Sequence, residues 1–302
     1  FVPQSDAELG SARGFIDKDR AAKVAGARFA YLKGNLVKLQ FAIIQMTLDI
    51  LGDEKLIARL ISENNLSLKP TAFVPVIPPA LVRTEPYQAS GRLDAQEVTY
   101  KLADDELWLN ASAEHSLCTM YMNETLPEDQ LPIRMVGYST SFRREAGSYG
   151  KDTEGIFRMH QFDKLEMEVF STADTGLEEH KLLVAIQEYL VQQLGLPYQL
   201  LQKCTADIGK PNAQGVDINT WMPAQAEYRE THTADYMTDF QARSLATKVK
   251  LQDGRTEYAH TNDATAFALG RIMKAILENH QQADGGVRVP EALQQYYGGE
   301  TL

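Results

Sequence analysis

The sequence predicts an α+β fold, in which an antiparallel β-sheet is flanked by helices within a single domain. Helix-like and strand-like segments follow one another without the regular strand–helix–strand alternation that a parallel sheet requires. A chain of 302 residues, 44% hydrophobic and 24% charged, has the composition of an ordinary globular protein. The sequence contains no internal repeat and no low-complexity tract. Together these observations favour one large α+β domain.

The first elements along the chain are helical. Apolar residues recur at helical spacing from Asp17 to Leu51, with a break near Gly34, and a second short helix is expected from Leu56 to Asn64. Ala72 to Val82 is rich in strand-forming residues. Pro78–Pro79 should close this strand, because proline is confined to the edges and ends of strands.

The rest of the chain is expected to contain several strands and two helices. The clearest amphipathic helix is expected from Leu177 to Leu194, where Gly195 and Pro197 stop it. A last helix is expected from about Asp263 to His280. Further strands are expected at Leu107–Leu109, Ile133–Ser141, Tyr198–Leu201 and Gly215–Trp221.

Composition narrows the functional class. A net charge of -11 argues against a generally basic nucleic-acid coat protein. Cys118 and Cys204 lie far apart and form no CxxC motif, so we expect two reduced, buried thiols. No apolar run reaches the roughly 18 residues of a membrane span, and no signal peptide is evident. We expect a cytoplasmic protein without membrane contact, and a first residue other than Met suggests a longer gene product.

The segment from Phe142 to Glu166 is the most informative one. It reads as strand, loop and strand, because Gly147, Gly150 and Gly155 punctuate its centre. On a returning strand, residues at even spacing share one face, so this pattern groups Arg158, His160 and Phe162, and likewise Lys164 and Glu166 if no bulge intervenes. Arginine forks suit phosphate, aromatic rings suit flat bases, and carboxylates suit ammonium groups. A salt-bridged surface hairpin is the alternative interpretation.

The fuller string FRREAGSYGKDTEGIFRMHQFDKLEME, from Phe142 to Glu168, resembles motif 2 of the class II aminoacyl-tRNA synthetases, in the version found in seryl-tRNA synthetases. Leu56 to Pro79 resembles motif 1, which supports the dimer interface of that class. Thr265 to Leu293 resembles motif 3. Arg271 in that segment is a lone charge among apolar residues, which usually lies at a solvent edge, whereas the resemblance places it in the site.

Three shorter strings resemble the same family. Ser112-Ala113-Glu114 is similar to the family's Thr-Ala-Glu, and YRETHTADYMTDFQAR from Tyr228 to Arg243 is similar to its Tyr-Arg-Glu segment. Where the family carries serines and often a cysteine, this chain has Thr231 to Asp235. The stretch beginning at His260 keeps a hydroxyl at Thr265 but has Asn262–Asp263 where the family usually has a Leu-Asn pair, so the serine pocket is expected to differ from the family pattern in detail.

The resemblance implies a class II synthetase-like catalytic domain over residues 1–302 that forms seryl-adenylate from L-serine and ATP and charges tRNA(Ser). It implies that Arg143 and Arg271 are catalytic. The implied ATP-binding residues are Arg143, Glu145, Phe162, Glu230, Thr233 and Arg271, with Mg²⁺ held through Glu230 and Thr233. The implied serine-binding residues are Ser112, Glu114, Glu166 and Thr265. No P-loop or GxGxxG fingerprint offers another nucleotide site.

Several alternatives stay open. A zinc site using His232, His260, Glu230 and Cys204 lacks usable ligand spacing, whereas Mg²⁺ is satisfied by one or two carboxylates plus phosphate oxygens. The family's N-terminal coiled-coil arm, which grips tRNA, is expected to be absent because no sustained heptad pattern occurs. The chain could therefore be a catalytic fragment, an armless ligase acting on a carrier protein, or a non-catalytic regulatory paralogue. The resemblance further implies a homodimer.

Overall fold

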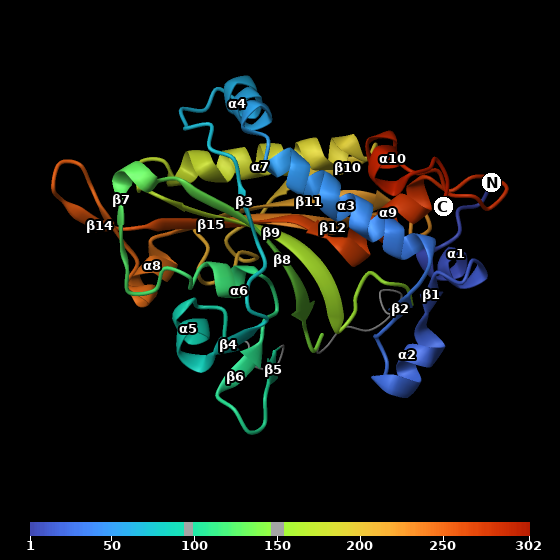
Figure 1. Ribbon diagram of the computed structural model, residues 1–302. Coiled ribbons are helices and arrows are strands. Elements are labelled where there is room, and N and C mark those ends of the chain that lie inside the picture. The colour runs from blue at the N-terminus through green and yellow to red at the C-terminus, as the bar shows by residue number, and fades with distance from the viewer. Residues whose placement is uncertain (94–98, 146–153) are drawn as a thin grey trace.

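A seven-stranded sheet forms the centre of the protein in a computed structural model that describes residues 1–93, 99–145 and 154–302 (Figure 1). Its neighbouring strands are antiparallel, except that β3 runs parallel to β8. The predicted α+β class with an antiparallel sheet is therefore confirmed. From one edge to the other the strands are β10 (Tyr198–Gln202), β11 (Gln214–Met222), β12 (Glu227–Thr238), β15 (His260–Ala268), β9 (Gln161–Ser171), β8 (Ile133–Phe142) and β3 (Val74–Val76).

Helices cover one face of this sheet, along its upper side in Figure 1. Strand β9 shows why, because Leu165, Met167 and Val169 belong to the main hydrophobic core while the alternate residues Lys164, Glu166 and Glu168 do not. Burying such an aliphatic side chain stabilises the fold by roughly 1.5–3 kcal/mol. The sheet therefore has an apolar face and a polar one. The covering helices are α3 (Asn35–Leu51), α7 (Gly176–Gln193), α9 (Leu269–Asn279) and α10 (Glu291–Tyr297).

The N-terminal region is more broken than its periodicity predicts. The helical segment expected from Asp17 to Leu51 is confirmed over Lys18–Val24 and Asn35–Leu51, with the expected break at Gly34. It is wrong between the two helices, where Gly26 and Gly34 have positive φ and β2 forms. Asp17 caps the first of them by accepting from the Arg20 backbone. The short helix expected near Leu56 is confirmed as α4. The elements of this region are α1 (Asp6–Ala12), β1 (Ile16–Asp17), α2 (Lys18–Val24), β2 (Tyr31–Leu32) and α4 (Glu54–Glu63).

Smaller elements lie against the polar face of the sheet and around its rim (Figure 1). The strand expected over Ala72–Val82 is two strands, β3 and β4, separated by the proline pair. Two three-stranded sheets have the orders β4-β6-β5 and β14-β13-β7. Their strands, with the neighbouring short helices, are β4 (Leu81–Arg83), α5 (Thr84–Ala89), β5 (Tyr100–Lys101), β6 (Leu107–Leu109), α6 (Glu114–Leu117), β7 (Thr125–Pro127), the 3₁₀ helix Glu128–Gln130, α8 (Phe240–Leu245), β13 (Lys248–Lys250) and β14 (Thr256–Tyr258).

The last long helix was predicted to begin near Asp263, and this boundary is wrong. Residues His260 to Ala268 form β15, and α9 begins only at Leu269. Strand β15 pairs with β12 on one side and β9 on the other, so it lies inside the sheet with nearly every residue buried. A strand buried on both faces loses the alternation of polar and apolar residues, and its pattern then resembles a buried helix.

Two further expectations concern the cysteines and the membrane. Both thiols are free, but only Cys118 is buried, so the expected burial of Cys204 is wrong. Cys204 follows β10 at an edge of the main sheet, where few elements cover it. Across the three described ranges, none of the helices combines the length and hydropathy needed to traverse a lipid bilayer.

Candidate active site

Two adjoining cavities open on the polar face of the sheet, one of about 510 Å³ and one of about 70 Å³. Nine of the ten site residues expected from the sequence line at least one of them, and Glu166 lies buried beside them. The structure thus gathers residues that are separated by up to 159 positions, from Ser112 to Arg271, into one place. Both cavities are lined by Arg143, Glu145, Arg158, Lys164, Glu230, Thr233 and Arg271.

The β8–β9 hairpin positions Arg143 and Phe162. Its register runs without a bulge from Ile133 opposite Phe170 to Phe142 opposite Gln161, so Phe162, Lys164 and Glu166 share the polar face. The Arg143 guanidinium lies 5.4 Å from the centre of the Phe162 ring, and its Nε donates to the Ala111 carbonyl at 3.1 Å. A flat arginine resting on a flat ring is held in a fixed orientation.

The expectation that Arg158 and His160 share the strand face with Phe162 is wrong, because β9 begins only at Gln161. The His160 backbone instead donates to the Arg28 carbonyl and accepts from the Arg143 backbone, which ends the ladder there. Arg158 still reaches the site and donates to Glu145 at 2.8 Å. The expected turn glycines Gly147 and Gly150 lie outside the described residues.

A bulge in β12 brings Glu230 and Thr233 to the same face. Residues three apart on a regular strand point to opposite faces, but here Ile218 pairs with His232 and Asn219 with Glu230, leaving Thr231 unmatched. This extra residue changes the phase of the alternation. The carboxylate and the hydroxyl therefore both line the two cavities.

Arg271 enters the site from the first turn of α9. A Cβ on Gly270 would lie 2.5 Å from the Ile156 carbonyl oxygen, so only glycine lets the helix approach so closely. The Arg271 guanidinium then lies 4.8 Å from the centre of the Phe157 ring and donates to Glu230 Oε1 at 2.9 Å. Its side chain is 17% exposed, so it does not lie at the solvent edge expected of a lone arginine on an apolar helix.

The packing of α6 on β8 brings Ser112, two residues before that helix, to the buried Glu166. Gly137 on β8 makes this possible, because a Cβ there would lie 2.7 Å from Leu117 and 3.0 Å from Ala113. Ser112 Oγ donates to Glu166 Oε2 at 3.2 Å, and Lys164 forms an ion pair with the same carboxylate. Glu166 is 0% exposed, and its Oε1 has no hydrogen-bond partner among the described residues. A buried polar atom left in this state is suited to receive a ligand.

The carboxylates around this pocket differ in charge state. Burial alone would raise the pKa of Glu114, but Arg92, 2.6 Å away, and other cations hold it at about 2. Burial raises the pKa of Glu166, which Lys164 offsets in part. Burial and the neighbouring Glu114 raise the pKa of Asp263 well above its ordinary value. The site therefore holds an ionised Glu114 beside carboxyls that gain protons more readily.

Sequence reasoning missed several residues of the cavities. Asp263 was noted only as a departure from the family pattern, and Asp235 as part of an altered segment, yet both line the larger cavity. Arg92 and Phe157 carry no signal in the sequence, because their partners Glu114 and Arg271 lie far away along the chain. Three-dimensional proximity alone identifies them.

The histidines considered for zinc are engaged elsewhere. His232 is buried and its Nδ1 lies 2.8 Å from Thr231 Oγ1, while His260 Nδ1 lies 2.6 Å from the Tyr236 hydroxyl. Within residues 1–93, 99–145 and 154–302, no three His, Cys, Asp or Glu side chains are grouped to hold a metal ion. Glu230 and Thr233 nevertheless both line the two cavities, and a carboxylate with a hydroxyl fits Mg²⁺ completed by phosphate oxygens.

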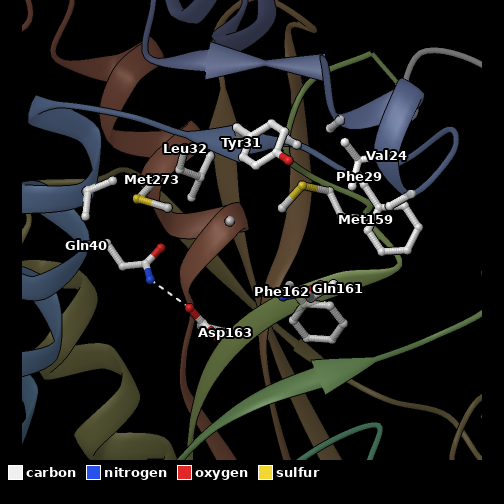
Figure 2. A pocket seen from close by; sticks show the side chains of 15 residues that line it. Val24, Phe29, Tyr31, Leu32, Gln40, Met159, Gln161, Phe162, Asp163 and Met273 are labelled. Carbon is white, nitrogen blue, oxygen red and sulfur yellow. Dashed lines mark hydrogen bonds between the residues drawn. The ribbon is translucent and has the colours of Figure 1, made fainter. Parts of the chain in front are cut away.

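Figure 2 shows a separate cavity of about 400 Å³ that shares Phe162 with the smaller one. Its walls are mainly apolar, including Phe29, Tyr31 and Met273. Gln40 donates to Asp163 at 2.8 Å, and Thr140 donates to the other oxygen of that carboxylate, which fixes the polar side of the cavity. This cavity is larger than the 70 Å³ one but lacks its array of charged groups.

Known proteins share the fold of this chain and much of its sequence. Residues 98–280 match the family described as "tRNA synthetase class II core domain (G, H, P, S and T)". The fold and site therefore define the catalytic core of a class II aminoacyl-tRNA synthetase. The chain is 41% identical to the serine–tRNA ligase of Cenarchaeum symbiosum and 40% identical to that of Deinococcus radiodurans, over 100% of this chain and 68% of each relative. Within the class, the chain belongs to the serine–tRNA ligases.

Solved structures agree with this assignment. The crystal structure of seryl-tRNA synthetase from Pyrococcus horikoshii complexed with ATP superposes with a TM-score of 0.90 at 40% identity, covering 100% of this chain and 64% of that one. The cytoplasmic serine–tRNA ligase from Naegleria fowleri in complex with AMP gives 0.86 at 28% identity, covering 99% of this chain and 67% of that one. The chain thus spans about two thirds of the length of its relatives.

Proposed function

We propose that this chain activates L-serine with ATP to form seryl-adenylate and pyrophosphate, and that the serine is then transferred to tRNA(Ser). The observation that carries the proposal is the convergence of Arg143, Phe162 and Arg271 with Ser112 and the adjacent Glu166 around two adjoining cavities on the polar face of the sheet. Cations and a ring are the groups that a nucleotide requires, and a buried carboxylate with a hydroxyl suits the amino acid.

The first half-reaction needs positioning more than proton transfer. The serine carboxylate is ionised at neutral pH, so it attacks the α-phosphorus of ATP without a general base, and the bond to the pyrophosphate breaks. The protein must hold two anionic reactants together and stabilise the charge that develops on the phosphate. The arginines supply the fixed positive charge, because a guanidinium stays protonated and binds phosphate through a planar fork.

Each nucleotide-binding side chain has a defined place in the proposal. Arg143, fixed on Phe162, binds the α-phosphate, and Phe162 stacks on one face of adenine. Arg271 covers the opposite face and reaches the γ-phosphate. Glu145, which Arg158 holds at 2.8 Å, accepts a hydrogen bond from the adenine amino group. Both arginines line the smaller cavity together with Phe162.

Magnesium belongs to the same proposal, with Glu230 and Thr233 as its protein ligands. When bound, the ion would neutralise phosphate charge that the arginines do not reach. Arg271 and Glu230 are 2.9 Å apart, so the arginine keeps the carboxylate oriented toward the cavity. Arg271 also holds the pKa of Glu230 below its ordinary value against the opposing effect of burial, which keeps the carboxylate ionised.

The serine pocket combines ionised groups with hydroxyl groups. Glu114 and Glu166 face the substrate ammonium, and Ser112 and Thr265 contact its polar atoms. Alanine would leave these buried groups unpaired, which costs about 10⁴-fold or more in comparable sites. Threonine must be rejected by exclusion of its extra methyl group.

We further propose that the chain acts as a homodimer in the cytoplasm and that one domain spans residues 1–302, with motifs 1 to 3 where the sequence resemblance places them.

The deciding experiment is amino-acid-dependent exchange between ATP and radiolabelled pyrophosphate. Exchange with serine, absent with threonine, alanine and glycine and reduced about 10²–10³-fold in Arg271→Ala, is the expected result, because removing one charge-stabilising group typically has that effect. Exchange with a different amino acid would reassign the pocket. No exchange from folded protein that binds ATP would favour the regulatory paralogue. Aminoacylation of tRNA(Ser) then tests the second half-reaction.

A further inference from the structure

Lys203, which belongs to none of the motifs and has no role in the proposal above, forms a buried charge cluster. Its ammonium lies 2.7 Å from Asp235 Oδ1 and 3.2 Å from Asp217 Oδ1 in two ion pairs, and it donates to Thr233 Oγ1 at 2.8 Å. The Lys203 side chain is only 9% exposed. An ammonium has three N–H groups, and here three oxygens surround it.

Gly215 is what allows the lysine to reach this position. Lys203 follows the last residue of β10 and its backbone donates to the Gly215 carbonyl, while Gly215 is paired with Asp235 on the next strand. A Cβ at position 215 would lie 2.2 Å from Lys203 Cε and 2.6 Å from Asp235 Oδ1. The lysine side chain therefore crosses over β11 through the gap that a glycine leaves.

The cluster adjoins the site through two of its members, Thr233 and Asp235. Thr233 lines both cavities, and Asp235 lines the larger one. Asp217 and Asp235 are two carboxylates less than 11% exposed, and like charges this close destabilise one another unless a cation lies between them. Burial lowers the pKa of Lys203, but Asp235 and Asp217 outweigh it and keep the ammonium charged.

We propose that the Lys203 ammonium is a built-in cation of this active site, occupying the place that a divalent metal ion would otherwise take among Asp217, Thr233 and Asp235. Two carboxylates and a hydroxyl are the oxygen ligands that Mg²⁺ accepts. The lysine fills that site permanently, orients the Thr233 hydroxyl, and removes negative charge that would repel the ATP phosphates. Lys203 is thus a positioning residue, and its link to catalysis rests on the proposed function.

The test is the response of Lys203→Ala to Mg²⁺, with Lys181→Ala as the matched control because Lys181 is an exposed lysine on α7. Without ATP or serine, Mg²⁺ should raise the melting temperature of Lys203→Ala and leave wild type and Lys181→Ala unchanged. In serine-dependent exchange at low Mg²⁺, kcat/KM for ATP should fall about 10- to 100-fold in Lys203→Ala, as expected for a lost charged hydrogen bond. Excess Mg²⁺ should restore it.

Two further variants keep the proposal falsifiable. Gly215→Ala should reproduce the Mg²⁺ dependence, because the added methyl group displaces the lysine. If Lys203→Ala folds only when Mg²⁺ is present, that dependence would itself support the proposal. Lys203→Gln then serves as the second variant. Identical melting responses to Mg²⁺ in wild type and the folded Lys203 variants would overturn it. Wild type without serine-dependent exchange would refute the proposed function, while the melting experiment would still decide the role of Lys203.

Discussion

Glu166 is an energetically costly residue of the proposed serine pocket. It is fully buried on β9, and while Ser112 and Lys164 contact Oε2, Oε1 lacks a hydrogen-bond partner among the described residues. Leaving a buried charged acceptor unsatisfied costs more than the roughly 1–3 kcal/mol of a neutral group. A fold retains such an atom where a ligand satisfies it, and we propose the substrate ammonium as that ligand.

Glu166→Gln should therefore weaken serine use while leaving ATP binding intact. A lost charge-assisted hydrogen bond is worth about 1.5–3 kcal/mol, so kcat/KM for serine should fall roughly 10- to 150-fold, with KM for ATP within a factor of about two. Exchange kinetics with each substrate varied in turn give both values. Glu300→Gln, at an exposed glutamate, is the control. An equal loss for both substrates would point to general damage rather than to the ammonium contact.

The same variant has a defined pH signature. Burial raises the pKa of Glu166, so protons are lost from it at a higher pH than from an ordinary glutamate. Only the ionised form pairs with an ammonium, so kcat/KM for serine should rise with pH as Glu166 deprotonates and should decline on acidification. Glutamine has no proton to lose, so this acidic limb should be missing in the variant.

Individual helices and strands differ in how well the sequence predicts them. The β8–β9 hairpin is local, and its spacing correctly predicts that Lys164 and Glu166 share one face. The family resemblance, rather than the spacing, indicates that the hairpin carries site residues instead of forming a salt-bridged surface hairpin. Strand β15 was mistaken for helix, since its environment comes from β12 and β9, which lie far away in the sequence. The bulge at Thr231 was equally invisible, because unmatched residues are defined only by the partner strand.

A buried ion pair joins strand β8 to helix α7. Arg134 Nε and Nη2 donate to the two oxygens of Glu179 at 2.9 Å each, and Nη1 donates to the carbonyls of Lys69 and Thr71. Neither charged side chain is more than 1% exposed. The sheet carrying the site and the helix behind it are therefore held in one alignment by a fully paired cation.

Glu179→Ala should destabilise the protein by about 3–5 kcal/mol, because it leaves the Arg134 guanidinium buried without its counter-ion. Urea unfolding followed by circular dichroism measures the difference. The double variant Arg134→Met with Glu179→Leu should recover most of the loss, since two apolar side chains replace a pair whose desolvation nearly cancels its attraction. If the double variant is as unstable as Glu179→Ala, packing rather than the uncompensated charge is responsible.

At the scale of the molecule, the seven-stranded sheet separates the hydrophobic core on one face from the candidate active site on the other. Its helix-covered face holds the main hydrophobic core, and its other face holds charged side chains that the core could not tolerate. Catalytic groups on sheet strands are held more precisely than groups on loops. The motifs of the sequence resemblance predict which segments contribute residues to the polar face. They do not predict that Lys203, Asp235 and Asp263 lie near the site, because this depends on how the strands pair.

The edge of the same sheet predicts an assembly. Strand β3 ends the strand order and pairs with β8 on one side only within the described part of the chain. Val74 is 60% exposed and Ile77, just beyond the strand, is 85% exposed. An unpaired strand edge with exposed apolar side chains is a suitable interface for a second copy of the chain. The segment that resembles motif 1 includes this strand.

Ile77→Asp should therefore convert a homodimer into a monomer. A carboxylate desolvated in an apolar interface costs several kcal/mol, so the dissociation constant should rise by about 100-fold or more. Sedimentation at micromolar concentration should give twice the 33.7 kDa chain mass for wild type and a single chain mass for the variant. Serine-dependent exchange should fall with dimer content, because β3 pairs with β8, the strand that leads into Arg143, and a second copy covering β3 would stabilise that pair. Val2→Asp, at an equally exposed apolar residue of the N-terminus, should leave the mass unchanged. A variant at Ile77 that still sediments as a dimer would place the interface elsewhere on the molecule.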